Sequence, residues 1–172
     1  MIKILVKGKS LVLEVLSGDK ILHSFHIKIG ANGLRKTKEG DKKTPVGNYK
    51  ILWKASVFQE DNPSKKLYKI TEGNSFALWN PKLKTTEFSR EFGTTDEELW
   101  RDSYGGEEAV VLCLDYPNVK DIAEGKTGSC IEIHATKNFH KPSLGCIKLT
   151  CEDAKILYCL VEVGTEVSIC DE

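Results

Sequence analysis

The chain has 172 residues, which is the usual size of one domain. Hydrophobic residues make up 40% of it and charged residues 29%, a composition typical of globular proteins that excludes disordered and fibrous classes. Its 25 basic and 25 acidic residues cancel. This balance argues against nucleic acid as a main partner, because phosphate binding needs a basic surface.

Hydrophobic segments in the chain are short. None approaches the roughly 18 consecutive apolar residues of a spanning helix, so we expect no membrane span. The apolar run at residues 2–6 is too short for the core of a signal peptide. The sequence alone therefore does not exclude a cytoplasmic location, and it leaves open whether a signal peptide was removed.

Six cysteines lie in the second half of the chain, at positions 113, 130, 146, 151, 159 and 170. If one of them stays free as a nucleophile, the remaining five cannot all pair within the chain. We expect most of them to be reduced, buried and used as small apolar residues.

The first third of the chain is predicted to form strands. β-prone runs at 2–6, 11–16 and 21–29 are separated by polar gaps that suit hairpin turns, so we expect an antiparallel meander. A polar, glycine-containing loop follows at 30–43. Pro45 then leads into a further strand, which we expect at 49–54. Proline is tolerated at the beginning of a strand, because the first residue can lack its N–H.

Residues 55–106 show a weaker pattern and are predicted to form an insertion, or lid, on the β scaffold. Within it we expect short strands at 67–70 and 76–79 and one or two helical turns at 95–101. Trp53, Trp79 and Trp100 lie in or beside this segment, either lining a cleft or packed as core or lid residues.

Regular patterns return after Gly106. We expect strands at 109–114, 129–134 and 166–170 and a short helix at 118–124. Thr150 as N-cap, with two acidic residues in the turn that follows, predicts the start of a longer helix, which continues until Gly164 stops it. In the strand at 129–134, alternation places Cys130, Glu132 and His134 on one face.

The stretch from His134 to Cys146 carries the candidate chemistry. A thiol is a good nucleophile only as a thiolate, and an imidazole can take its proton. Here a His ends a strand and a Cys follows a Ser-x-Gly turn, so the connecting loop can bring the two side chains together. Gly145 would allow close approach of a substrate, and N–H groups at this turn could form an oxyanion hole. A purely structural cysteine is the competing interpretation.

Zinc binding is a second alternative, because Cys130, His134, Cys146 and Cys151 offer four ligands. Residues four apart on a strand lie roughly 13 Å from each other, whereas zinc ligands converge on one ion. We therefore expect no metal.

Several motifs in order resemble the L,D-transpeptidase catalytic domain (YkuD-like) family. They are Gly40-Asp41-Lys42-Lys43-Thr44-Pro45-Val46-Gly47-Asn48-Tyr49, then Asp115-Tyr116-Pro117-Asn118, then Ile133-His134 with Ser143-Leu144-Gly145-Cys146-Ile147, and finally Val163-Gly164-Thr165-Glu166-Val167. The resemblance implies one catalytic domain over 1–172, with a mainly β, β-sandwich-like fold and one or two packed helices. Many members have His where Leu144 stands.

Position by position, the resemblance implies Cys146 as nucleophile and His134 as base, oriented by the Ala135 carbonyl, with Gly145 completing the catalytic set. The implied activity is a cysteine-dependent L,D-transpeptidase that acts on peptidoglycan stem peptides through a thioester. The alternatives are an L,D-carboxypeptidase that hydrolyses the tetrapeptide stem and a non-catalytic wall-binding module.

For substrate binding, the expected residues are Ser143, Lys148 and Tyr116. Ser143 would bond the substrate or stabilise the turn, and Lys148 would bind a peptide carboxylate or be a solvated lysine. The family implies action in the periplasm or cell envelope. We expect no cofactor, no partner beyond the peptidoglycan peptide, and a monomer.

Overall fold

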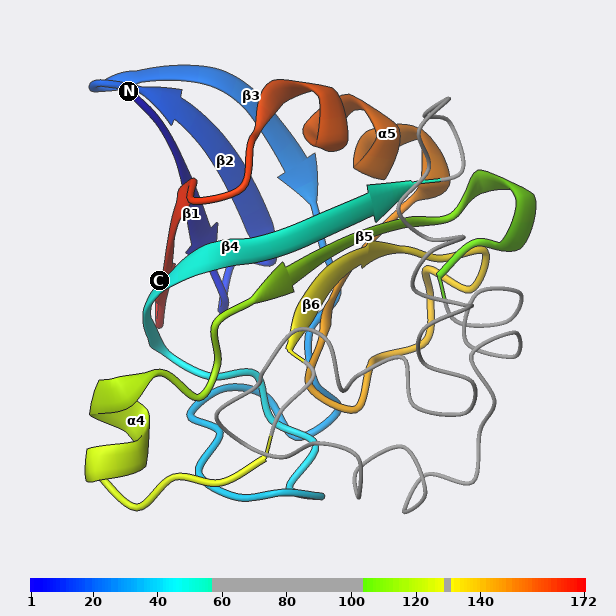
Figure 1. Cartoon of the computed structure of the whole chain (residues 1–172). Helices are drawn as coiled ribbons and strands as arrows, with labels where there is room; N and C mark the ends of the chain where they lie inside the picture. The colour runs from blue at the N-terminus through cyan, green and yellow to red at the C-terminus, as the bar shows by residue number, and fades with distance from the viewer. Residues whose placement is uncertain (57–103, 129–130) are drawn as a thin grey trace.

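The computed structural model describes residues 1–56, 104–128 and 131–172 (Figure 1). Most predictions for the insertion therefore lie outside the described residues: the strands at 67–70 and 76–79, the helix at 95–101, and the side chains of all three tryptophans. The described chain does correct one boundary. The strand expected at 49–54 runs from Gly47 to Ser56, so it extends into the segment that was assigned to the insertion.

Strands dominate the described chain, which confirms the mainly β prediction. They are β1 (Ile2–Lys7), β2 (Val12–Ser17), β3 (Lys20–His26), β4 (Gly47–Ser56), β5 (Val110–Leu114), β6 (Glu132–Ala135), β7 (Ile147–Leu149) and β8 (Glu166–Cys170). Two α-helices, α4 (Val119–Ala123) and α5 (Cys151–Leu160), and one 3₁₀ turn, η4 (Gly106–Glu108), complete this part of the chain.

The eight strands form one mixed sheet in the order β3-β2-β1-β8-β4-β5-β6-β7. The first three make the expected antiparallel meander, and β8 inserts between β1, which is parallel to it, and antiparallel β4. A bridge between Lys28, just after β3, and Lys148 in β7 joins the two ends of this order. The sheet is therefore curled almost into a barrel rather than divided into two separate layers.

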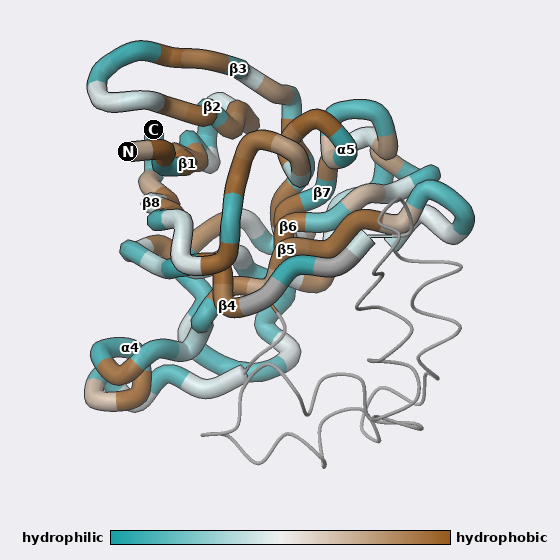
Figure 2. The backbone as a smooth tube through the Cα atoms, turned by 45° about the horizontal axis from the view of Figure 1, so that its top comes forward, coloured by the Kyte–Doolittle hydropathy of each residue, from teal (hydrophilic) through white to brown (hydrophobic). Residues whose placement is uncertain are grey.

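The hydrophobic core lies inside the curl and under α5, which packs on β5, β6 and β7. Every residue of β5 is buried, and Figure 2 shows hydrophobic residues along β5. In β1, by contrast, burial alternates, with Ile4 and Val6 fully buried. A strand covered on both faces needs apolar residues throughout, whereas a half-covered strand alternates.

Both predicted helices are present, and each begins directly after its capping residue. Asn118 and Asp121 form a capping box at α4, and Thr150 accepts a hydrogen bond from the Asp153 N–H at the start of α5. The predicted end of the second helix was wrong, because α5 ends at Leu160 rather than near Gly164. Val161 is already extended, at φ −125° and ψ 154°. The Lys54 ammonium group compensates by binding the carbonyls of residues 158 and 161.

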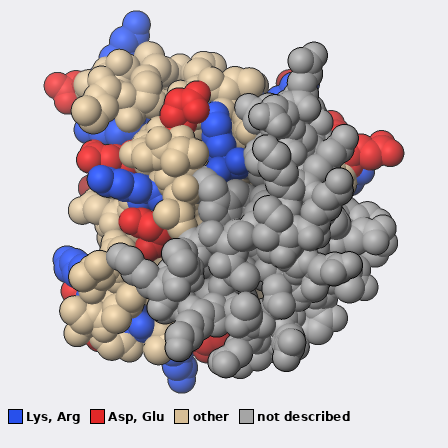
Figure 3. All heavy atoms as spheres, viewed as in Figure 1, with Lys and Arg blue, Asp and Glu red and all other residues tan. Residues whose placement is uncertain are grey.

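Charged side chains of both signs are interspersed over the described part of the face in Figure 3. This agrees with the zero formal charge of the sequence. None of the helices in the described ranges is long and apolar enough to cross a membrane.

Candidate active site

The pairing of β6 with β7 brings the candidate nucleophile and base onto one surface. The two strands run parallel, with His134 opposite Lys148. Because side chains alternate along a strand, the same face carries Glu132 on β6 and Cys146 just before β7. The intervening residues of both strands point to the opposite face and join the hydrophobic core. His134 and Cys146 are therefore diagonal neighbours on the same face.

A direct contact supports this register. The Cys146 thiol donates to Glu132 Oε2 over a Sγ–O distance of 4.0 Å. The hydroxyl of Tyr104 donates to the same oxygen at 2.6 Å. Glu132 is only 1% exposed, and its second oxygen, Oε1, is buried without a hydrogen-bond partner in the described chain. A buried, nearly unpaired carboxyl group therefore lies beside the candidate nucleophile.

His134 is oriented by its own strand. Its Nδ1 lies 2.8 Å from the carbonyl oxygen of Ala135. Because a carbonyl oxygen only accepts, Nδ1 carries the hydrogen and Nε2 carries the lone pair that can take a proton. The ring also packs edge-on against Tyr104, with centroids 5.0 Å apart. This arrangement suits the base role expected of His134 and the orienting role expected of the Ala135 carbonyl.

The turn before Cys146 is held by its own polar groups. Ser143 Oγ accepts from the Gly145 N–H at 3.0 Å and donates to the Cys146 carbonyl. Gly145 has φ +145°, and a Cβ there would lie 2.8 Å from the Lys43 carbonyl oxygen. Only glycine fits this backbone and this contact. Since the Gly145 N–H is engaged, the geometry favours a structural role for Ser143 and Gly145 in shaping the turn.

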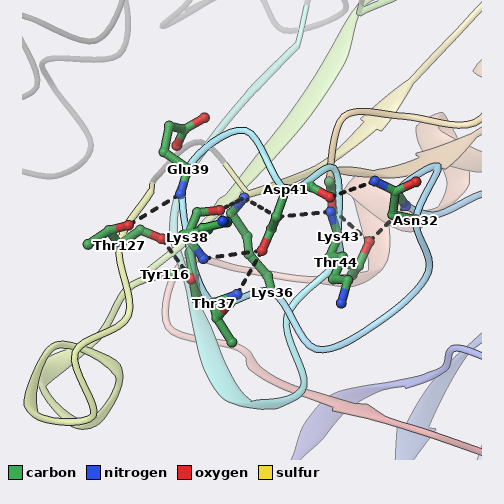
Figure 4. A network of polar contacts seen from close by, with 12 residues as sticks. Asn32, Lys36, Thr37, Lys38, Glu39, Asp41, Lys43, Thr44, Tyr116 and Thr127 are labelled. Atoms are coloured by element: carbon green, nitrogen blue, oxygen red, sulfur yellow. Dashed lines mark hydrogen bonds and ion pairs between the residues drawn. The ribbon is translucent and has the colours of Figure 1, made fainter.

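The loop that precedes β4 supports this turn from outside. Thr44 Oγ1 donates to the Gly145 carbonyl at 2.7 Å and accepts from the Gly30 N–H. Figure 4 shows that Asp41 organises the same loop. Its carboxylate binds the Lys36 ammonium group at 2.9 Å and accepts from the backbone N–H groups of residues 37, 38 and 43.

Lys148 shares the face with His134 and Cys146, but its side chain is used within the chain. It is 8% exposed, and its Nζ donates to the carbonyls of Asn138 and Lys141 at 3.1 and 2.9 Å. Both carbonyls belong to the loop that joins His134 to Cys146. This placement supports a role in fixing that loop, and binding of a substrate carboxylate stays a prediction.

Tyr116 is completely buried among the core residues. Its hydroxyl donates to the Thr127 carbonyl at 3.0 Å, and its ring packs edge-on against Tyr49. These contacts explain why an aromatic residue suits this position in the core. A substrate-binding role for Tyr116 stays a prediction.

Burial shapes the titration of the site. It raises the pKa of Glu132 from 4.5 to about 8, although the Tyr104 hydrogen bond lowers it. Burial and then the Glu132 charge raise the pKa of the Cys146 thiol well above its ordinary value, opposed by the Glu132 backbone and by lysine charges. The pKa of Lys148 is lowered, again chiefly by burial. These effects favour the protonated thiol of Cys146, so the candidate nucleophile would need a base to become a thiolate.

The five described cysteines are all free: Cys113, Cys146, Cys151, Cys159 and Cys170. Only Cys113 is fully buried, so the expectation that most are buried is wrong for this set, and Cys159 is exposed. Cys130, one of the four zinc ligands considered above, lies outside the described residues. Within them, no three His, Cys, Asp or Glu side chains cluster as metal ligands would.

Sequence reasoning did not single out Glu132 or Tyr104 as functional candidates. Alternation placed Glu132 on the face of His134, and an acidic residue between two isoleucines was the signal available in the sequence. The contact with Cys146 depends on the pairing of two strands, which no local pattern specifies. Tyr104 comes from the end of the predicted insertion, where the sequence pattern is weak.

Comparisons with known proteins agree with this architecture. The chain aligns with Bd1075 from Bdellovibrio bacteriovorus at 23% identity and a TM-score of 0.59, covering 99% of this chain and 48% of that one. For the helical cell shape determining protein Pgp2 from Campylobacter jejuni, the identity is 21% and the TM-score 0.59, with the same coverage. A Xylanimonas cellulosilytica L,D-transpeptidase gives 10% identity and a TM-score of 0.51, covering 98% and 60%.

The chain thus spans about half the length of the first two of these proteins, and likenesses at such identities show the fold alone. No curated protein sequence matches the chain. The family model of the L,D-transpeptidase catalytic domain, YkuD, matches residues 2–169, which is nearly the whole chain. The chain belongs to the YkuD family of L,D-transpeptidase catalytic domains.

Proposed function

We propose that the chain is a cysteine-dependent acyl transferase that acts on the peptide stems of peptidoglycan. Cys146 attacks a stem-peptide carbonyl, a D-amino acid leaves, and a thioester joins the remaining stem to Cys146. An amine then resolves the thioester in transpeptidation. The observation that carries this proposal is the shared face of β6 and β7, on which His134 and Cys146 are diagonal neighbours.

Proton transfer follows from the orientation of His134. With Nδ1 bound to the Ala135 carbonyl, Nε2 accepts the thiol proton, and the resulting thiolate then attacks the carbonyl carbon. The same nitrogen then gives that proton to the departing amine. In the second half of the reaction it takes a proton from the attacking amine and returns it to the sulfur. No other proton carrier is required.

The substrate class and the place of action rest on the family. Its model describes an L,D-transpeptidase catalytic domain, and such domains act on peptidoglycan. We therefore expect action in the cell envelope. Pgp2 is described as a determinant of helical cell shape, and a contribution of this chain to cell shape is part of the proposal.

Hydrolysis is a second candidate because of Leu144. This residue is 62% exposed and stands directly before Gly145 and Cys146, where many family members have His. An exposed leucine offers no hydrogen bond to an incoming amine, whereas water needs no such guidance to reach a thioester. This observation favours L,D-carboxypeptidase activity, with a tripeptide stem as product.

The test is incubation with purified tetrapeptide and pentapeptide muropeptides, followed by mass analysis of the products. We expect release of a D-amino acid and a thioester adduct on Cys146. Cys146→Ala should abolish both, while the matched variant Cys159→Ala, which alters an exposed cysteine on α5, should keep both. Turnover by Cys146→Ala at the rate of the unmodified chain would refute the proposal.

An acceptor titration then separates transfer from hydrolysis. If transfer dominates, added D-amino acid or a second stem peptide diverts product from the free tripeptide to the exchanged or cross-linked form. A tripeptide yield that stays constant over a wide range of acceptor concentration would exclude transpeptidation. A product consisting only of exchanged stem would exclude the carboxypeptidase.

A further inference from the structure

The carboxyl group of Glu132 contacts the reacting sulfur atom, and nothing in the proposed reaction uses it. Oε2 accepts from Tyr104 at 2.6 Å and from the Cys146 thiol at 4.0 Å. Oε1 is buried and has no hydrogen-bond partner in the described chain. Burying an ionised carboxylate with one oxygen unsatisfied is costly. The neutral acid, which has a proton to donate, suits this position better.

The described groups around Glu132 do not compensate a negative charge. Cys113 on β5 is a buried thiol whose pKa is raised well above its ordinary value, by burial and then by Glu132. On β6 the neighbour is His134, and Tyr104 precedes η4. Lys148 on β7 directs its ammonium group to two loop carbonyls. Among the described residues, Glu132 forms no salt bridge.

We propose that Glu132 acts in its protonated form, as a hydrogen-bond donor to Cys146 Sγ when that sulfur is negatively charged. The inference rests on the proposed function, since it assigns a second group to the same thiol chemistry. When the thiol proton passes to His134, the sulfur becomes an anion and Glu132 keeps its own proton. The carboxyl O–H then donates to the sulfur, and no bond to Glu132 is made or broken.

The same hydrogen bond serves each step in which the sulfur carries charge. It is present before attack, weakens in the neutral thioester, and forms again when the sulfur leaves during transfer or hydrolysis. An ionised Glu132 would do the opposite, because a carboxylate beside the sulfur opposes a second negative charge. Since the pKa of Glu132 is about 8, the donor is lost as the pH rises above that value.

This assignment predicts an unusual pH profile. An ordinary thiol reacts faster with an alkylating agent as the pH rises, because more of it is thiolate. Here we expect the alkylation rate of Cys146 to fall above about pH 8, by up to about tenfold per pH unit. Iodoacetamide is a suitable probe, with the label located by mass spectrometry, because this reaction requires no peptidoglycan substrate.

Three variants test the assignment. Glu132→Gln keeps the size and a donor but cannot ionise, so its rate should not fall above about pH 8. Tyr104→Phe removes a bond that lowers the pKa of Glu132, so the fall should move to higher pH. Glu14→Gln alters another buried glutamate, paired with Lys7 on the opposite part of the sheet, and should follow the unmodified chain.

Two results would overturn the inference. One is a Glu132→Gln profile that falls at the same pH as that of the unmodified chain. The other is a folded Glu132→Gln variant whose Cys146 is unreactive at every pH, which would mean that the ionised carboxylate is required. If Glu132→Gln does not fold by circular dichroism, an unchanged profile for Tyr104→Phe refutes the inference by itself.

Failure here is distinguishable from failure of the proposed function. Cys146 could show an ordinary rising profile and still convert muropeptides, in which case only the role of Glu132 is wrong. The reverse outcome, the expected profile without any turnover, would keep the role of Glu132 and reject the substrate class.

Discussion

Replacing Asp41 with Asn should destabilise the fold by an amount that depends on pH. Burial raises the pKa of Asp41, but hydrogen bonds from the Thr37 N–H, the Lys36 ammonium group and two further backbone N–H groups lower it from 3.8 to about 2. A shift of that size corresponds to about 2 kcal/mol in favour of the folded state at neutral pH. For a domain of this size the melting temperature should fall by roughly 4–8 °C.

The direction of the pH dependence follows from the difference in the pKa of Asp41 between the folded and unfolded states. The pKa is depressed in the folded state, so the stabilisation is complete above about pH 4 and is lost as the pH falls towards about 2. Urea unfolding of both proteins at several pH values measures the difference in free energy. As a control, Asp171→Asn removes an ion pair with Arg35, which is 72% exposed, and should cost less than about 1 kcal/mol. An equal stability of the Asp41→Asn and unmodified proteins at neutral pH, or a deficit that persists below about pH 2, would refute the reasoning.

Three further variants probe the site and its support. Lys148→Met removes two hydrogen bonds to the loop between His134 and Cys146. In muropeptide turnover, kcat should therefore fall by about tenfold with little change in KM. A rise in KM alone would indicate that Lys148 binds a substrate carboxylate instead. Between about pH 4.5 and 8, the Glu132 carboxyl ionises freely only in the unfolded state, so the unfolding free energy of the unmodified chain should decline by roughly 1 kcal/mol per pH unit. Glu132→Gln should abolish this decline, as measured by urea unfolding. A decline that persists in the variant would contradict this. Lys54→Met leaves two carbonyls at the end of α5 without their donor. The unfolding free energy should therefore fall by about 1–3 kcal/mol. An unchanged stability in thermal or urea unfolding would show that water replaces the lysine.

Local patterns were sufficient for the elements whose signals lie within a few residues. Alternation and polar gaps predicted the meander of β1, β2 and β3, and the side chain of Thr150 predicted the start of α5. The end of α5 was missed because the apolar spacing continues through Val161, which is buried although its backbone is extended. Burial, rather than helical conformation, maintained that pattern.

The pairing of strands that are distant in the sequence could not be predicted from local patterns. β7 has only three residues, which are too few to show the alternation of a strand. Its parallel partner β6 comes before it in the chain, and the loop that connects them contains no helix. The sequence suggested that His134 and Cys146 could meet, but the register is what places Glu132 beside Cys146. Lys148 illustrates the same limit, because a lysine in sequence gives no indication that its ammonium group is bound inside the chain.

The connection between β6 and β7 explains why so many polar groups gather near the candidate site. Parallel neighbours are usually joined through a helix, which holds the crossover by its own packing. Here the connection contains no helix, and it is held instead by Lys148 from β7, by Ser143 within the turn and by Thr44 from the loop before β4. Because Thr44 belongs to the loop that Asp41 organises, stability of that loop and position of Cys146 are linked. Loss of the Asp41 carboxylate should therefore reduce the reactivity of a thiol that it does not touch.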